Sequence, residues 1–120
     1  MKLIDFGTAK LLHGKDKESN TTGNKGTLAY MSPELMVWKP RDFSPIDHKA
    51  CDMWSLGATI YQTLTYELVV QRLPRMMLVD YNKALFKFYK EINEVKVDRK
   101  KLRLNEEHKD FWILVIENLL

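Results

Sequence analysis

The chain has 120 residues, 45% of them hydrophobic, and a formal net charge of +3. This length allows one domain with a core, since a folded chain of this size removes roughly 65% of its unfolded surface from water. Its basic residues are spread along the sequence rather than gathered with aromatic residues, so we expect no nucleic-acid partner. A single cysteine, Cys51, excludes an internal disulfide and a cysteine-based zinc cluster.

No charged and then apolar leader opens the sequence, and its longest apolar run, residues 111–116, is too short to cross a bilayer. The lone cysteine suits a reducing compartment. We therefore expect an intracellular, cytoplasmic protein without a membrane partner.

The first part of the chain predicts two short strands followed by a polar loop. Residues 2–4 are β-prone and end at Asp5-Phe6-Gly7, where glycine gives the backbone freedom to turn. Residues 8–12 predict the second strand. Residues 13–25 contain two glycines and no apolar residue, which is typical of a loop.

Order is predicted to return at residues 26–34, where Pro33 suits the first turn of a short helix over residues 34–37. A polar connection with two prolines follows at residues 39–49. Asp47 within it is a suitable N-cap for the next helix.

Residues 50–64 predict a central helix, and its apolar residues fall on more than one face, as in a helix buried nearly all round. Asp52 lies near its start. A buried carboxylate costs several kcal/mol unless donors meet it, so Asp52 would need partners. The alternative is an ordinary surface acid near a helix N-terminus, where the helix dipole favours negative charge.

Two later helices are expected at residues 80–93, behind an Asp80 cap, and at residues 105–120, behind an Asn105 cap. The charged residues 94–103 between them predict a loop. The last helix carries a broad apolar stripe, made of Phe111, Trp112, Leu114, Val115, Ile116 and Leu119.

The sequence contains three motifs in this order: Asp5-Phe6-Gly7, then Gly26-Thr27 with Ser32-Pro33-Glu34, then Asp52-x-Trp54-Ser55-Leu56-Gly57. In this order they resemble the C-terminal lobe of a eukaryotic protein kinase of the serine/threonine type. The resemblance is strong over residues 2–64 and only topological over residues 81–120. It implies a mainly α, partial kinase fold over residues 1–120, with two short N-terminal strands and an activation segment at residues 5–34.

The resemblance also implies roles for individual residues. Asp5 would hold the Mg²⁺ that bridges the ATP phosphates, a task that suits a hard oxygen ligand, while Phe6 would be the packing residue and Gly7 the pivot beside it. Thr27 would lie in the substrate-docking loop and contact the catalytic aspartate of the family. The long stretch between Glu34 and Asp52 is similar to that of the IκB-kinase-related group.

Structural roles follow by the same resemblance. Glu34 would pair with a buried arginine, and Asp52 would accept backbone N–H bonds from the catalytic loop, while Trp54 and Gly57 would pack the central helix. Glu34 could equally be an ordinary first-turn acid.

Three hydroxyls in the polar loop, Ser19, Thr21 and Thr22, are candidate phosphorylation sites for an upstream kinase, although such hydroxyls are often merely solvated.

The implied function is transfer of the ATP γ-phosphoryl group to a serine or threonine of a protein substrate, with ATP and Mg²⁺ as cofactors. The sequence contains no glycine-rich phosphate loop, no strand lysine with its helix glutamate and no His-Arg-Asp catalytic loop. We therefore expect the 120-residue chain alone to be inactive. The alternative is a non-catalytic, pseudokinase-like binding module or a truncated remnant.

Overall fold

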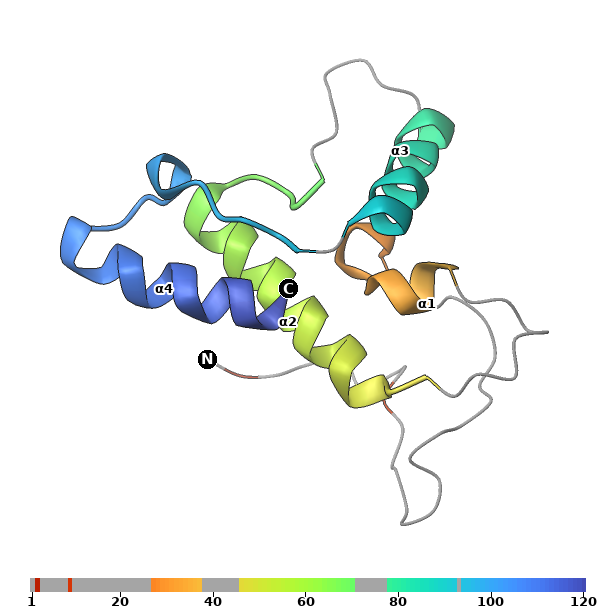
Figure 1. Ribbon diagram of the computed structural model, residues 1–120, viewed down its shortest axis with the longest axis horizontal. Helices are drawn as coiled ribbons and strands as arrows, with labels where there is room; N and C mark the ends of the chain where they lie inside the picture. The colour runs from red at the N-terminus through yellow and green to blue at the C-terminus, as the bar shows by residue number, and fades with distance from the viewer. Residues whose placement is uncertain (1, 3–8, 10–26, 38–45, 71–77, 93) are drawn as a thin grey trace, which may run out of the picture.

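The computed structural model describes residues 2, 9, 27–37, 46–70, 78–92 and 94–120, and these residues are mainly helical (Figure 1). Within them the elements are the 3-10 helix η1 (Leu28–Tyr30), α1 (Pro33–Val37), α2 (His48–Thr65), α3 (Leu78–Glu91), the 3-10 helix η2 (Arg99–Lys101) and α4 (Glu106–Leu119). The mainly α fold class is confirmed. Of the two predicted strands the structure describes only Lys2 and Ala9, neither of which is assigned to a strand, and the predicted loop at residues 13–25 lies outside the described residues.

The longest helix, α2, begins where the sequence indicates. Asp47 caps it: Oδ1 accepts hydrogen bonds from the backbone N–H groups of Lys49 at 2.9 Å and Ala50 at 3.2 Å. The helix ends at Tyr66, whose backbone is left-handed with φ of 60°. The Arg103 guanidinium lies 4.6 Å from the centre of the Tyr66 ring, within the range of a cation–π contact. The predicted central helix is therefore confirmed, with two residues more at its start and one more at its end.

Two groups of buried side chains meet on α2. Trp54 packs in the first group and Tyr61 in the second. Figure 1 shows α4 running beside α2 and α3 beside α1. The first group therefore joins α1, α2 and α3, and the second joins α2 to α4 and to the segment that precedes α4. The first group contains Met31, Met36, Trp54, Tyr81, Leu85 and Val95. The second contains Tyr61, Val97, Leu102 and Ile116.

The expectation that α2 is buried nearly all round is wrong. One face of it is exposed, including Asp52, Thr59 and Thr63, and Met53 and Leu56 keep 48% and 44% of their surface accessible. The main contacts of α2 are with α4 and η1, and these cover the opposite face. Apolar residues on several faces of α2 therefore do not mean that another element packs against each of those faces.

The segment between α3 and α4 was predicted as a charged loop, and the structure corrects this in part. Its side chains alternate, so that Val95 and Val97 are buried while Lys96 and Asp98 are exposed. η2 follows, started by Asp98, which accepts from the Lys100 N–H at 2.9 Å. Leu102 beyond it is 3% exposed. The segment thus contributes three residues to the core.

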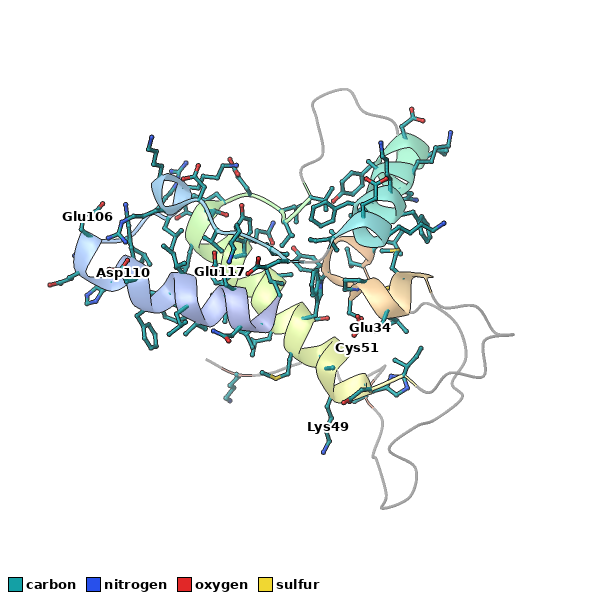
Figure 2. All side chains as sticks on the ribbon, viewed as in Figure 1. Glu34, Lys49, Cys51, Glu106, Asp110 and Glu117 are labelled. Carbon is teal, nitrogen blue, oxygen red and sulfur yellow. The ribbon has the colours of Figure 1, made fainter. Side chains whose placement is uncertain are left out.

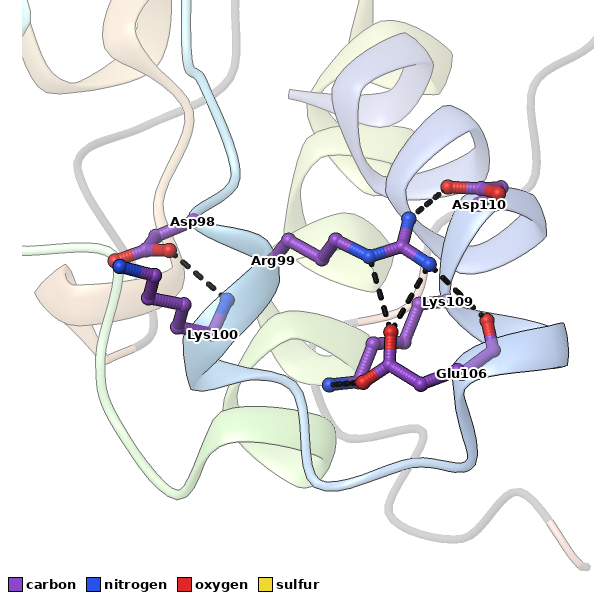
Figure 3. A network of polar contacts seen from close by, with 6 residues as sticks. All are labelled: Asp98, Arg99, Lys100, Glu106, Lys109 and Asp110. Atoms are coloured by element: carbon purple, nitrogen blue, oxygen red, sulfur yellow. Dashed lines mark hydrogen bonds and ion pairs between the residues drawn. The ribbon is translucent and has the colours of Figure 1, made fainter.

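A network of charged side chains joins η2 to the start of α4 (Figure 3). Arg99 donates to Glu106 through Nε at 3.2 Å and Nη2 at 3.1 Å, and it also donates to Asp110. Lys109 donates to Glu106 at 2.7 Å. The hydrogen bond from Lys109, and then that from Arg99, lowers the pKa of Glu106. The contribution of the Glu106 carboxylate to the stability of the folded chain is therefore present above the ordinary glutamate pKa. It is lost as the pH falls through the lowered pKa.

Candidate substrate-docking site

The predicted substrate-docking loop contains an ordered turn at residues 27–31, named the docking turn after that prediction. Thr27 is exposed and extended, with φ of −84° and ψ of 118°, and η1 starts directly after it. The Tyr30 N–H donates to the Thr27 carbonyl at 3.0 Å, and the Met31 N–H donates to the Leu28 carbonyl at 3.2 Å. Behind the turn, Ala29 and Met31 are buried. The turn therefore presents Thr27 outward from a surface that is fixed to the core.

Two side chains of α2 hold this turn. The Tyr30 hydroxyl donates to Oε1 of Gln62, and the Ser55 hydroxyl lies 2.8 Å from the Tyr30 carbonyl oxygen. Ser55 Oγ also lies 3.0 Å from the Cys51 carbonyl within α2. The sequence did not predict these contacts. Gln62 lies outside the recognised motifs, and Ser55 lies within one of them but had no role assigned to it.

α1 begins directly behind the docking turn. Ser32 is fully buried, its Oγ lies 3.4 Å from the Leu35 N–H, and its carbonyl accepts from the Met36 N–H at 2.9 Å. Serine before Pro33 is therefore compatible with a helix start, because its hydroxyl reaches an otherwise unpaired first-turn N–H. Glu34 is exposed in this first turn.

Glu34 and Cys51 point toward one another where α1 meets α2 (Figure 2). The Cys51 Sγ lies 3.5 Å from Glu34 Oε1. Burial raises the pKa of the Cys51 thiol from 9.0 to about 11, against the opposing effect of a hydrogen bond with Ser32, and the Glu34 charge raises it further. The thiol is therefore neutral at physiological pH.

Because Cys51 is 5% exposed and protonated, we predict that iodoacetamide alkylates it slowly in the folded protein at pH 8. The rate should rise as the pH approaches 11, where the folded thiol ionises. Mass spectrometry of intact protein follows the reaction at the only cysteine of the chain, with a urea-unfolded sample as the fast control. Equal rates in the folded and unfolded samples would contradict this burial.

The remaining sequence-predicted residues divide into two groups. Trp54 is buried beside Met31 and Met36, and Gly57 faces the end of α4, so both lie near the docking turn or the α2–α4 contact. Asp52 is exposed, and its expected burial is wrong because it lies on the face of α2 opposite the described contacts. Its role is a prediction still.

The residues predicted to serve ATP and Mg²⁺ are not among those that the structure describes. Asp5, Phe6 and Gly7 are outside the described residues, as are Ser19, Thr21 and Thr22. Among the described residues, no three histidine, cysteine or acidic side chains are grouped to hold a metal ion. No helix in the described ranges is long and apolar enough to cross a membrane.

The chain therefore holds an exposed, hydroxyl-bearing turn against its longest helix, α2. Comparison with known proteins assigns it to a family: residues 1–118 match the model of the protein kinase domain. The chain belongs to the protein kinase domain family.

Similar proteins include protein kinases from Homo sapiens and Synechocystis sp.. Mitogen-activated protein kinase kinase kinase 5 of Homo sapiens is 36% identical over 94 residues, which are 78% of this chain and 6% of that protein. Serine/threonine-protein kinase A of Synechocystis sp. is 43% identical over 68 residues, 57% of this chain and 12% of that protein. 3-phosphoinositide-dependent protein kinase 1 of Homo sapiens is 39% identical over 62 residues, 52% of this chain and 10% of that protein.

The chain thus spans a small part of the length of these relatives. No solved structure matches it significantly.

Proposed function

We propose that this chain is part of a protein serine/threonine kinase. That kinase transfers the γ-phosphoryl group of ATP to a serine or threonine hydroxyl of a protein substrate. The observation that carries the proposal is the exposed Thr27 on a turn anchored to α2, in a chain whose residues 1–118 match the protein kinase domain. Gly26-Thr27 at this place is the serine/threonine form of the family motif. One of the similar proteins, that of Synechocystis sp., is named a serine/threonine-protein kinase, which agrees with this assignment.

In this proposal Thr27 contacts the docked substrate and the catalytic aspartate, and the rigid turn sets its position. Asp5 is the carboxylate offered to Mg²⁺, and Phe6 and Gly7 set its orientation. A carboxylate suits this ion, which prefers oxygen ligands. When bound, Mg²⁺ neutralises charge on the phosphoryl oxygens.

Four further residues have structural roles in the proposal. Trp54 and Gly57 fix α2 against its neighbours, since Trp54 packs in the core and a Cβ at Gly57 would meet α4. Glu34 is offered to a buried arginine partner, and Asp52 to backbone donors of a catalytic loop. Both carboxylates are exposed in the described chain, so each is accessible to such a partner.

Regulation is proposed to act on the polar loop rather than on the docking turn. Ser19, Thr21 and Thr22 lie near Lys15, Lys17 and Lys25 in the sequence, where an upstream kinase could add a phosphate that pairs with basic groups. Mass spectrometry of the active, full-length protein should find phosphate at one or more of these three hydroxyls. Stoichiometric phosphate on Thr27 alone would reverse the two roles.

The function is tested by incubating the full-length protein with γ-labelled ATP, Mg²⁺ and a mixed protein substrate. We expect labelled substrate, and we expect the label to disappear when EDTA removes the divalent cation. Absence of transfer by pure, folded protein under conditions that activate it would favour the non-catalytic binding module.

A further inference from the structure

α2 ends in a backbone conformation that tyrosine rarely adopts. Tyr66 has φ of 60° and ψ of 20°, in the left-handed region, and its N–H donates to the Gln62 carbonyl at 2.7 Å. Glycine is the usual residue at such a helix end, because a Cβ in this conformation crowds the backbone. Tyrosine therefore costs stability here, and a strained residue of this kind often marks a functional site.

Burial does not explain why a tyrosine occupies this position. The neighbouring Thr65 is 3% exposed, and its hydroxyl donates to the Tyr61 carbonyl at 2.7 Å and accepts from the Glu67 N–H at 3.1 Å. These contacts hold the backbone of the helix end. Tyr66 itself keeps 71% of its surface accessible, so its ring adds little to the core. The ring must therefore be considered for what it does at the surface.

The ring contacts one fixed side chain, that of Arg103. Its guanidinium lies 4.6 Å from the centre of the Tyr66 ring. The Arg103 N–H donates to the Leu64 carbonyl at 2.8 Å, and the preceding Leu102 is 3% exposed, so the backbone of this segment is anchored to the end of α2. An arginine held at both its backbone and its guanidinium loses little conformational freedom when it binds a ligand.

The positive charge of Arg103 is not neutralised within the described chain. Nearby in η2, Arg99 is paired with two acids of α4, and Lys101 is paired with Glu67 at 2.7 Å. Among the residues that the structure describes, no carboxylate forms an ion pair with Arg103. Its N–H donors are therefore available to an anion. The planar fork of a guanidinium matches the two oxygens of a carboxylate.

We propose that Tyr66 and Arg103 form a docking site for an acidic segment of a partner protein. A glutamate or aspartate of that segment accepts hydrogen bonds from Arg103, and an apolar side chain next to it packs on the exposed Tyr66 ring. Tyrosine and arginine are enriched among the residues that contribute most to protein interfaces. The site goes beyond the proposed kinase function, since binding here involves neither ATP nor phosphoryl transfer.

A nucleic acid fits this surface less well than an acidic peptide does. Binding to a phosphate backbone gains its strength from several cations that each neutralise a phosphate. Arg99 and Lys101 are already paired with acids of the chain, so Arg103 offers a single charge beside an aromatic ring. One fixed guanidinium with an apolar neighbour suits one carboxylate with an apolar neighbour.

The site is tested by fluorescence polarisation with the full-length protein and a fluorescein-labelled peptide. The peptide carries two glutamates flanked by leucines, and a matched peptide carries glutamines in their place. We expect saturable binding of the glutamate peptide and at least about ten-fold weaker binding of the glutamine peptide, as loss of a charged hydrogen-bonded partner produces. Equal binding of the two peptides, or no saturable binding of the glutamate peptide, would overturn the inference.

Variants of Arg103 place the binding on this surface. Arg103→Gln should weaken binding of the glutamate peptide by at least about ten-fold, and Arg103→Lys should restore only part of it, because lysine keeps the charge but not the fork. The matched control is Lys87→Gln, which removes one positive charge from an exposed position on α3 and should bind as the parent does. Parent affinity in Arg103→Gln would show that the peptide binds elsewhere and would refute the site.

Tyr66→Gly separates recognition from backbone strain. Glycine suits the left-handed helix end, so we expect the free energy of unfolding to be no lower than in the parent. Binding of the glutamate peptide should nevertheless weaken by about two- to five-fold, because the ring that orients Arg103 is lost. Tyr66→Phe keeps the ring and should bind as the parent does. If Tyr66→Gly bound the peptide as tightly as the parent, Tyr66 would have no part in docking and the inference would fail.

Two further probes test the class of partner. One is the same peptide with phosphoserine in place of both glutamates, and the other is a single-stranded oligonucleotide of similar length. Binding of the phosphoserine peptide without binding of the glutamate peptide would contradict the assignment to carboxylates. Tighter binding of the oligonucleotide than of the glutamate peptide, lost in Arg103→Gln, would contradict the assignment to a protein partner.

Discussion

Asp5→Asn in the full-length protein is expected to lower kcat for phosphoryl transfer by more than about a hundred-fold. Asparagine has nearly the same size but no charge, so it offers a much weaker ligand to Mg²⁺. The transition state then loses electrostatic stabilisation, and it loses more than the bound substrate does, so kcat falls. Steady-state kinetics with saturating ATP measure the effect.

The matched control is Asp80→Asn, which makes the same change at an exposed acid in the first turn of α3. This variant should retain the parent kcat, and both variants should keep the parent circular dichroism spectrum. Turnover within about ten-fold of the parent for Asp5→Asn would contradict the assigned role of Asp5.

Gly57→Ala is expected to lower the free energy of unfolding by about 1–3 kcal/mol, as overpacking does elsewhere. The glycine lies where α2 meets the end of α4, and a Cβ there would be 2.7 Å from the Leu119 Cβ and 3.0 Å from Leu120 Cδ2. Side chains in ordinary contact are about 1 Å further apart, so α4 must shift. On an exposed helix, the same change would instead stabilise the helix by about 1 kcal/mol.

Urea unfolding followed by circular dichroism measures this change. Thr63→Ala on the exposed face of the same helix serves as the control and should be neutral or slightly stabilising, because alanine has the better helix propensity. If Gly57→Ala were as stable as the parent or more stable, the close approach of α2 and α4 would be wrong.

Local sequence signals predicted most of the helical framework. Asp47 before the apolar run fixed the start of α2, since its side chain bonds the first free N–H groups of the helix. The periodic apolar residues of α3 and α4 placed both helices to within two residues of their observed bounds. These features depend on neighbours in the sequence, so a reading of the sequence can find them.

Features that depend on distant neighbours were missed. Nothing local says which face of α2 lacks a covering element, so the exposure of Asp52 and Leu56 could not be read from the helix alone. The same holds for Tyr30 and Gln62, which are 32 residues apart. Val95 and Val97 alternate with charged residues, a pattern that indicates burial of the two valines. The high charge of residues 94–103 led instead to the prediction of a loop.

The kinase motifs predicted more of the site than the helical periodicity did. They singled out Thr27, which the structure places on an exposed turn, and Trp54 and Gly57, which it places in close contacts. They did not indicate how the turn is held. That information lies in the geometry of α2 and η1, which only the folded chain contains.

The proposed serine/threonine specificity is measured most directly with three peptides that differ only in the acceptor residue, which is serine, threonine or tyrosine. The full-length protein is incubated with each peptide, ATP and Mg²⁺, and the initial rate of phosphate transfer is measured. We predict transfer to the serine and threonine peptides and none above background to the tyrosine peptide. Preferential transfer to tyrosine, or no transfer to any of the three by the activated protein, would contradict it.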